Sequence, residues 1–161
     1  MPNVKTNNNG NPAAFLNYAR WYHEAVECLF EYKPHLSDPI NALYFHIVEL
    51  AFKAFLRAHN RDPWGHDIED LYENCRTLGL KIKSDDQLAL GNIVSLLARG
   101  NEKMAFRYFI PESKSEPDLK WTREVVGQLL QAVAVFVEPN GPAAPGPAVK
   151  FRMVIGRPET A

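Results

Sequence analysis

The stretch that decides the fold is PINALYFHIVELAFKAFLRA, residues 39–58. Its apolar residues recur every three or four positions, which predicts an α-helix, and successive helical residues turn by about 100°. One broad apolar arc then contains Ile40, Leu43, Tyr44, Ile47, Leu50, Ala51, Ala54 and Ala58. A second arc contains Phe45, Phe52 and Leu56. A helix that is apolar on nearly all sides is buried, so we expect another helix or a second subunit to cover the second arc.

A narrow polar stripe separates the two arcs and consists of His46, Glu49, Lys53 and Arg57. Two interpretations of this stripe remain open. It is either the one solvated face of a central helix, with Glu49 and Lys53 forming an i,i+4 pair that contributes only about 0.2–0.5 kcal/mol, or it lines a polar site. In the second case His66 and Asp67 lie close to it across the following turn.

Four more helices are predicted by helical spacing and by start and stop residues, over residues 13–32, 66–78, 84–98 and 117–137. In the first helix we expect the apolar stripe to be Phe15, Tyr18, Tyr22, Ala25, Val26 and Leu29. Ser37-Asp38-Pro39 predicts the start of the second helix, and Gly79 is placed to cap the end of the third. The fold class is therefore all-α, a compact up-and-down bundle of about five helices.

The two ends of the chain differ from this bundle. Residues 1–12 lack periodicity and are expected to be a disordered tail, residues 13–138 form the bundle, and residues 139–161 are a Pro/Gly-rich linker and tail. Apolar residues alternate from Val149 to Ile155, which predicts a short C-terminal β-strand. Its partner is either the alternating stretch around Phe106 or another chain.

The charge balance excludes a strong overall attraction to nucleic acid, because 18 basic residues face 19 acidic ones in 161 residues. A nucleic-acid contact must therefore come from a local patch. The run RGNEKMAFRY, residues 99–108, interleaves basic and aromatic side chains, including Arg107 and Tyr108. Such a mixture is typical of single-strand binding, although a surface loop with packed aromatic residues is the alternative.

Cysteine usage and hydropathy indicate a cytoplasmic protein without cofactors. Cys28 and Cys75 lie beside apolar residues and are expected to be buried thiols, and no Cys/His spacing typical of a metal site is present. We therefore expect no metal and no cofactor. No apolar run approaches the roughly 20 residues that span a bilayer, so no membrane association is expected.

Two runs joined by a polar loop, DPINALYFHIVELAFKAFL (residues 38–56) and GHDIEDL (residues 65–71), resemble the HEPN superfamily. The resemblance is strongest over residues 38–71. It implies a compact helical bundle, frequently homodimeric, of the kind found in bacterial defence and toxin–antitoxin systems and beside nucleotidyltransferases. A protein partner encoded nearby is part of that expectation.

Many HEPN members cleave RNA without a metal and carry an Arg and a His separated by four to six residues. Arg61 and His66 have this spacing, so the resemblance implies that they are catalytic. A histidine can transfer protons near neutral pH, and an arginine can stabilise charge on a phosphate. His46 is an alternative base, since Glu49 one turn later can orient it. Glu49, Lys53 and Asp67 would help to bind the substrate.

The leading functional hypothesis is an RNA- or nucleotide-interacting protein with metal-independent endoribonuclease activity. Two alternatives remain. One is a non-catalytic bundle for protein association, with the second apolar arc and the C-terminal strand as contact surfaces. The other is a bundle that binds a small molecule.

Overall fold

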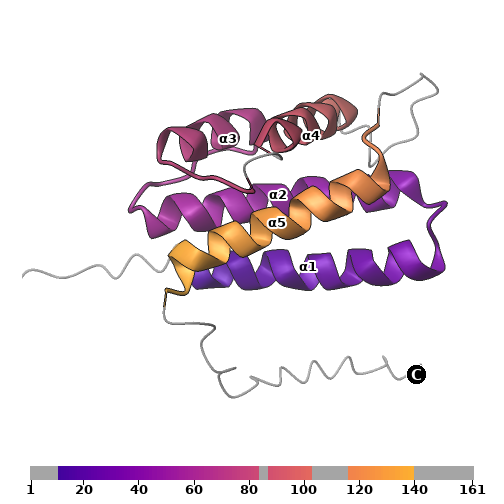
Figure 1. Ribbon diagram of the computed structural model, residues 1–161, viewed down its shortest axis with the longest axis horizontal. Helices are drawn as coiled ribbons and strands as arrows, with labels where there is room; N and C mark the ends of the chain where they lie inside the picture. The colour runs from indigo at the N-terminus through magenta and orange to yellow at the C-terminus, as the bar shows by residue number, and fades with distance from the viewer. Residues whose placement is uncertain (1–10, 84–86, 103–115, 140–161) are drawn as a thin grey trace, which may run out of the picture.

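The computed structural model describes residues 11–83, 87–102 and 116–139, which form five α-helices (Figure 1). These ranges contain no β-strand, so the predicted all-α bundle is confirmed. The helices are α1 (Pro12–Tyr32), α2 (Ser37–Ala58), α3 (Ile68–Thr77), α4 (Gln87–Gly100) and α5 (Leu119–Val137).

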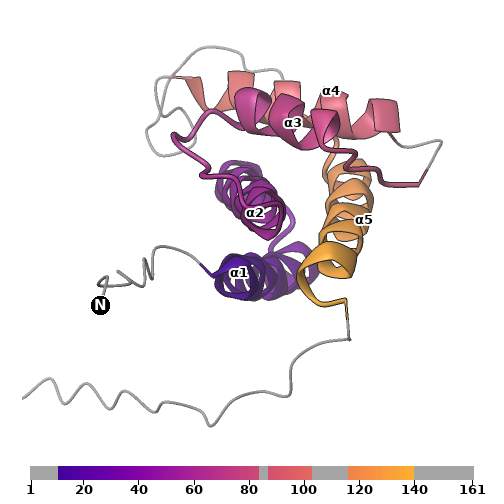
Figure 2. The same ribbon diagram turned by 90° about the vertical axis from the view of Figure 1, so that its left-hand side faces the viewer.

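The helices form two layers. In Figure 1, α1, α2 and α5 run side by side, and α1 points in the opposite direction to the other two. Figure 2 views α1 and α2 nearly end-on and shows α3 and α4 lying across the top of them. Helix α2 is therefore surrounded by α1, α5 and the α3–α4 pair, and its burial explains why it is apolar on nearly all sides.

Side-chain caps fix where three of the helices begin. The Oδ1 atoms of Asn11, Asp67 and Asp118 accept hydrogen bonds from backbone N–H groups in the first turns of α1, α3 and α5. Helix α2 begins differently, because it starts at Ser37 and the residue before it, Leu36, provides no side-chain cap. The predicted helix start at Ser37-Asp38-Pro39 is therefore confirmed, since these residues form the first helical turn, but the expected side-chain cap is absent because the N-cap residue is Leu36.

The core is centred on α2. Tyr44, Phe52 and Phe55 are its largest side chains and are fully buried. Phe52 and Leu56, from the second apolar arc, are covered within the same chain, so this arc needs no second subunit. Burial of each large apolar side chain contributes roughly 1.5–3 kcal/mol, which makes α2 the main stabilising element of the bundle.

The buried face of α1 differs from the prediction. Its buried residues are Leu16, Ala19 and Val26, whereas Tyr18 and Ala25 are exposed. Helix α1 carries two apolar stripes, and helical spacing alone does not show which of them faces the core. The expected apolar stripe therefore combined residues from both.

The two thiols also have different environments. Cys75 is buried, its thiol donates to the carbonyl oxygen of Phe52 at 3.6 Å, and burial raises its pKa. Cys28 lies on the outer face of α1 and is exposed. The prediction of two buried thiols is thus wrong for Cys28, for the same reason that it fails for Tyr18 and Ala25.

Several predicted features fall outside the described residues. These are the tail over residues 1–10, the run that contains Arg107 and Tyr108, and the C-terminal linker and strand. Within the described ranges, no helix has both the length and the apolar character that crossing a bilayer requires.

Candidate functional site

The connection between α2 and α3 folds back along the polar stripe of α2. Arg57 is paired with Asp62 at 2.5 Å, and Glu49 is paired with His66 at 2.7 Å. Eight helical residues span about 12 Å, and four extended residues span about 13 Å. The loop therefore runs nearly extended beside α2, and the positive φ of Gly65 (82°) lets it turn toward α3 directly before His66.

The Glu49 carboxylate is the centre of the polar stripe. It is 5% exposed, and its Oε1 accepts hydrogen bonds from Lys53 Nζ at 2.6 Å and from His66 Nδ1 at 2.7 Å. His46 Nδ1 lies 3.8 Å from the other carboxylate oxygen, Oε2. The stripe is therefore not one solvated face, because its central residues are buried around an ion-pair cluster.

Glu49 is ionised in the folded protein. Burial alone raises the pKa of a carboxyl group, but the interactions with His46, Lys53 and His66 outweigh burial and lower the pKa of Glu49 to about 2. A carboxylate in this state only accepts hydrogen bonds. Whatever group faces it must therefore donate.

This requirement fixes the tautomer of the neutral His66 ring. Because Glu49 only accepts, the proton of neutral His66 lies on Nδ1, and Nε2 keeps its lone pair. The His66 side chain is 83% exposed, and Nε2 has no partner among the residues that the structure describes. The arrangement presents to solvent a base whose ring is oriented by a buried carboxylate, which is suited to proton transfer.

His46 is held less firmly than His66. Its side chain is 42% exposed, and its ring packs edge-to-face on Tyr22 with a centroid distance of 4.6 Å. At 3.8 Å from Glu49, its Nδ1 is beyond normal hydrogen-bond distance. His46 thus belongs to the cluster, but its position is set mainly by packing on α1.

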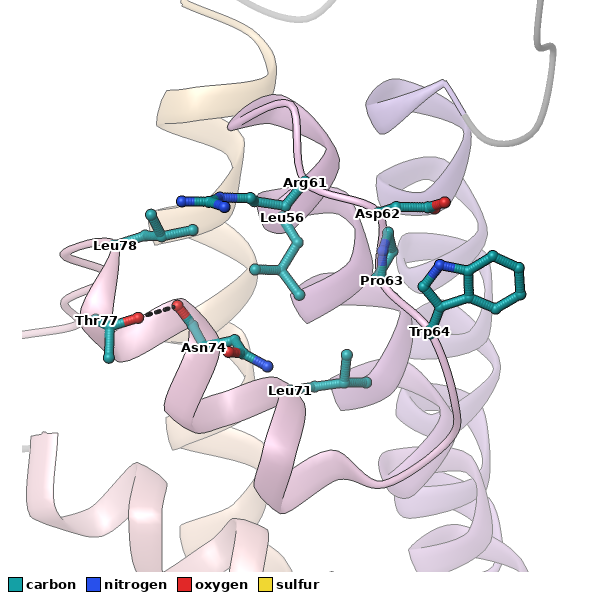
Figure 3. Close-up of a pocket in the computed structure, with 9 residues that line it drawn as sticks. All are labelled: Leu56, Arg61, Asp62, Pro63, Trp64, Leu71, Asn74, Thr77 and Leu78. Atoms are coloured by element: carbon teal, nitrogen blue, oxygen red, sulfur yellow. Dashed lines mark hydrogen bonds between the residues drawn. The ribbon is translucent and has the colours of Figure 1, made fainter.

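Arg61 lies on a different side of the loop. It lines a cavity of about 390 Å³ whose floor is aliphatic, with Leu56, Leu71 and Leu78 among the lining residues. Figure 3 shows the Arg61 side chain reaching across this cavity toward Leu78, while the Trp64 indole points away from it. The guanidinium forms no hydrogen bond or ion pair with any described residue, so it is free to bind an anion.

A second, larger groove of about 570 Å³ is lined by residues of α1 and α5 together with Lys83. Arg123 is bound there to the carboxylate of Glu27 and stacks over the Phe30 ring, with 4.9 Å between Cζ and the ring centroid. Burial lowers the pKa of the neighbouring His23, which favours its neutral form. This groove shares no lining residue with the Glu49 cluster.

Comparison with known proteins adds one positive result. Residues 13–139 match the HEPN domain. The chain belongs to the HEPN family. No curated protein and no solved structure matches it. The resemblance seen over residues 38–71 is thus confirmed, and the match extends over most of the chain.

In this HEPN chain, the structure brings together only part of the predicted site. His46, Glu49, Lys53 and His66 converge on one carboxylate, whereas Arg61 contacts none of them. Asp67, expected to bind substrate, caps α3 by accepting from the N–H groups of Glu69 and Asp70 at 2.9 and 3.2 Å. Across the described ranges, no cluster of three or more His, Cys, Asp or Glu side chains is arranged to hold a metal ion.

Two features of the candidate site were not predicted. One is the Arg57–Asp62 pair that attaches the loop to α2, and the other is Trp64, which is 83% exposed in the same loop. The sequence signal for the Arg57–Asp62 pair was a basic residue at the end of the helix followed by an acidic residue in the loop. The signal for Trp64 was its place between Pro63 and Gly65 in a loop, because an aromatic side chain there has few neighbours to pack against and is expected to be exposed.

Proposed function

We propose that this HEPN-domain protein binds single-stranded RNA beside the α2–α3 loop and cleaves it without a metal. The observation that carries the proposal is the contact between Glu49 and His66, a buried carboxylate holding an exposed imidazole at 2.7 Å. The family resemblance favours a role in a defence or toxin–antitoxin system, with a protein partner encoded nearby.

The proposed reaction uses the 2′-hydroxyl of the RNA as the nucleophile. His66 Nε2 accepts the hydroxyl proton while the 2′-oxygen forms a bond to phosphorus, and the bond from phosphorus to the 5′-oxygen breaks. The leaving 5′-oxygen takes a proton from water, and the hydroxide ion that remains takes the proton from the His66 imidazolium. The products are a 2′,3′-cyclic phosphate and a 5′-hydroxyl. The Glu49 carboxylate stabilises the imidazolium that His66 becomes during the reaction.

Arg61 has a separate role in this proposal. Because it does not contact His66, we assign it to a neighbouring phosphate of the same strand and not to the phosphate that is cleaved. Its unpaired guanidinium offers two parallel N–H donors to such a group. Lys53 is less suited to this role, since its side chain is 12% exposed and already bonded to Glu49.

Cleavage of labelled single-stranded RNA in the presence of EDTA tests the proposal. We expect His66→Ala to lower the rate by about 10²–10⁴-fold, the usual contribution of a general base. Arg61→Ala is expected to raise the KM for RNA by about 10–100-fold with little change in kcat, because it removes a charge-assisted hydrogen bond of about 1.5–3 kcal/mol to a phosphate that is not cleaved. The matched controls are His35→Ala and Arg76→Ala, both at exposed positions away from the cluster.

The site assignment is wrong if cleavage survives both His66→Ala and Arg61→Ala. If the wild-type protein neither cleaves nor retains RNA, the proposed function as a whole is wrong. Equal losses in the His35→Ala control would show that the assay measures folding and not catalysis.

Binding of a small molecule without chemistry is a second candidate function. It is favoured by the cavity beside Arg61, which combines an aliphatic floor with one unpaired cation, the usual make-up of a ligand site. Its test is calorimetric titration with mononucleotides. Binding that disappears in Arg61→Ala, in a protein that does not cleave RNA, would favour this candidate.

We also propose that the protein is a homodimer, as the HEPN resemblance implies. Sedimentation at micromolar concentration measures this directly. A monomeric mass at all concentrations tested would contradict it.

A further inference from the structure

Trp64 is the most exposed large apolar side chain among the described residues, and it lies two residues before His66. Trp64 is 83% exposed, and so is the His66 side chain. Two residues of chain extend at most about 7 Å, so the indole and the imidazole reach solvent from neighbouring points of one loop. Figure 3 shows the indole on the same side of the loop as the Asp62 carboxylate, opposite to Arg61.

The backbone around Trp64 is anchored on both sides. Ion pairs with α2 hold Asp62 before it and His66 after it. Pro63 directly precedes Trp64, and its ring fixes its own φ. An indole has only two side-chain torsion angles, so little conformational freedom is lost when a ligand orders it. The loop thus presents a flat apolar surface at a defined place beside His66.

The size of this surface favours a single flat ring over a protein partner. An indole presents at most about 250 Å², whereas specific protein interfaces bury at least about 1,000 Å² in total. The exposed residues near Trp64 offer little further apolar area, since they are Asp62, Gly65, His66 and Asp67. One ring of another molecule is enough to cover a face of the indole.

The charge beside Trp64 favours an uncharged ring. The Asp62 side chain is 53% exposed on the same side of the loop, so its carboxylate repels a phosphate placed there. A phosphate is favoured at Arg61, which points the other way. The base is the part of an RNA strand that is both uncharged and flat, and unpaired bases stack on aromatic side chains.

We propose that Trp64 stacks on the base of a nucleotide that flanks the phosphate cleaved at His66. This role rests on the RNA cleavage proposed above and adds to it a residue that selects the substrate. A base must leave its helical stack to lie on the indole, so single-stranded segments are cleaved and paired segments are not. Every base has a π-face, so the contact tolerates any sequence and favours purines, whose two rings cover more of the indole.

Steady-state cleavage of a defined substrate in EDTA tests the contact. The substrate is a short DNA oligonucleotide with one ribonucleotide, so that only one phosphate has a neighbouring 2′-hydroxyl. We expect Trp64→Ala to raise the KM about 5–150-fold, the usual effect of losing one stacked base, with little change in kcat. Trp64→Phe should recover most of the loss because it keeps a ring. Trp21→Ala is the matched control, since Trp21 is an exposed tryptophan on α1.

Removal of one base from the substrate identifies the partner of the indole. An abasic nucleotide on one side of the cleaved phosphate should raise the wild-type KM about as much as Trp64→Ala does. That substrate has no base to stack there, so Trp64→Ala should cause no further loss. Placing the abasic nucleotide on each side in turn shows which base is bound. Losses that add fully at both positions would overturn the stacking role.

Tryptophan fluorescence gives an independent readout in His66→Ala, in which bound RNA is not cleaved. We expect single-stranded RNA to quench the emission of this protein and of its Trp21→Phe derivative. The quenching should be lost in the Trp64→Phe derivative, because the stacked indole is absent. Quenching that persists in Trp64→Phe would contradict the contact.

The outcomes separate this inference from the proposed function. Cleavage with the wild-type KM in Trp64→Ala overturns the stacking role and leaves the proposed function standing. Equal losses of kcat in Trp64→Ala and Trp64→Phe would show that the substitutions displace His66, which also overturns it. A wild-type protein that neither cleaves nor binds RNA overturns both.

Discussion

Glu49 is the residue on which the other groups of the site depend. It lies between Lys53 and His66 in the folded chain, is almost fully buried, and keeps its charge because both neighbours donate to it. Removing the charge while keeping the shape would leave Lys53 nearly buried without a counter-ion. Such an unpaired buried charge is strongly destabilising.

The lowered pKa of Glu49 predicts how stability depends on pH. The pKa is about 2 in the folded protein, below its ordinary value of 4.5, so the stabilisation is fully present above about pH 4.5 and is lost as pH falls toward 2. The shift corresponds to about 3 kcal/mol. We expect Glu49→Gln to remove this part of the pH dependence in urea unfolding measured between pH 5 and pH 2.

Glu24→Gln is the matched control, because Glu24 is exposed on α1. If Glu49→Gln keeps the wild-type slope between pH 5 and pH 2, the carboxylate is not the buried, ionised group described above.

For individual residues, the sequence predicted which side chains lie together but not the role of each one. Helical spacing placed His46, Glu49 and Lys53 on one stripe, and the resemblance added His66. The burial of Glu49 was not predictable from α2 alone, because it depends on the loop that lies over the stripe. Arg61 was paired with His66 by spacing, yet the extended loop directs the two side chains to different sides.

The α2–α3 loop is the element that positions His66, and Gly65 is its turning point. With φ at 82°, Gly65 adopts a conformation that costs an alanine roughly 1–2 kcal/mol. We expect Gly65→Ala to lower the RNA cleavage rate at least about tenfold by moving His66 away from Glu49. Gly127→Ala is the control, because that glycine lies within α5 with no atom near the added methyl group.

Gly127→Ala should leave cleavage unchanged and raise stability by up to about 1 kcal/mol, since alanine favours a helix over glycine. Equal cleavage rates in wild type and Gly65→Ala would mean that the backbone at Gly65 does not determine the position of His66.

Substitution of Asp67, at the end of the same loop, distinguishes a structural role from a role in RNA binding. Its carboxylate caps α3 with two hydrogen bonds, so we expect Asp67→Ala to lower the free energy of unfolding by about 1 kcal/mol. RNA retention, measured by filter binding, should change little beside the loss caused by Arg61→Ala. A loss of RNA retention as large as that of Arg61→Ala would show that Asp67 contributes to RNA binding.

The sequence predicted well which residues form helices, but it did not predict which face of each helix is buried. All five helices lie where spacing and capping residues placed them, within a few residues at each end. The face that each helix buries depends on its neighbours. Helix α1 shows this, because its two apolar stripes have similar spacing and only one of them contacts α2 and α5.

Across the whole molecule, ion pairs between distant residues attach α1 to α5. Arg20 donates two hydrogen bonds to Glu138, at 2.8 and 2.9 Å, across 118 residues of chain. No sequence pattern indicated this pair. The Glu138 side chain is 10% exposed, and Arg20 is the cation that pairs with it.

We expect Arg20→Met to lower the free energy of unfolding by about 2 kcal/mol, because it leaves a nearly buried carboxylate without its partner. Arg76→Met should have no measurable effect, since its pair with Glu73 is exposed. Chemical denaturation followed by circular dichroism measures both. Similar losses in the two variants would show that burial of Glu138 does not strengthen the pair.

In the proposed reaction His66, oriented by Glu49, activates the 2′-hydroxyl of RNA. Analysis of the RNA ends formed in the presence of EDTA tests this claim most directly. We expect 2′,3′-cyclic phosphate and 5′-hydroxyl ends from the wild-type protein, and we expect them to be lost in His66→Ala and retained in His35→Ala. Fragments with 3′-hydroxyl ends, or cyclic phosphate ends that persist at the wild-type rate in His66→Ala, would contradict it.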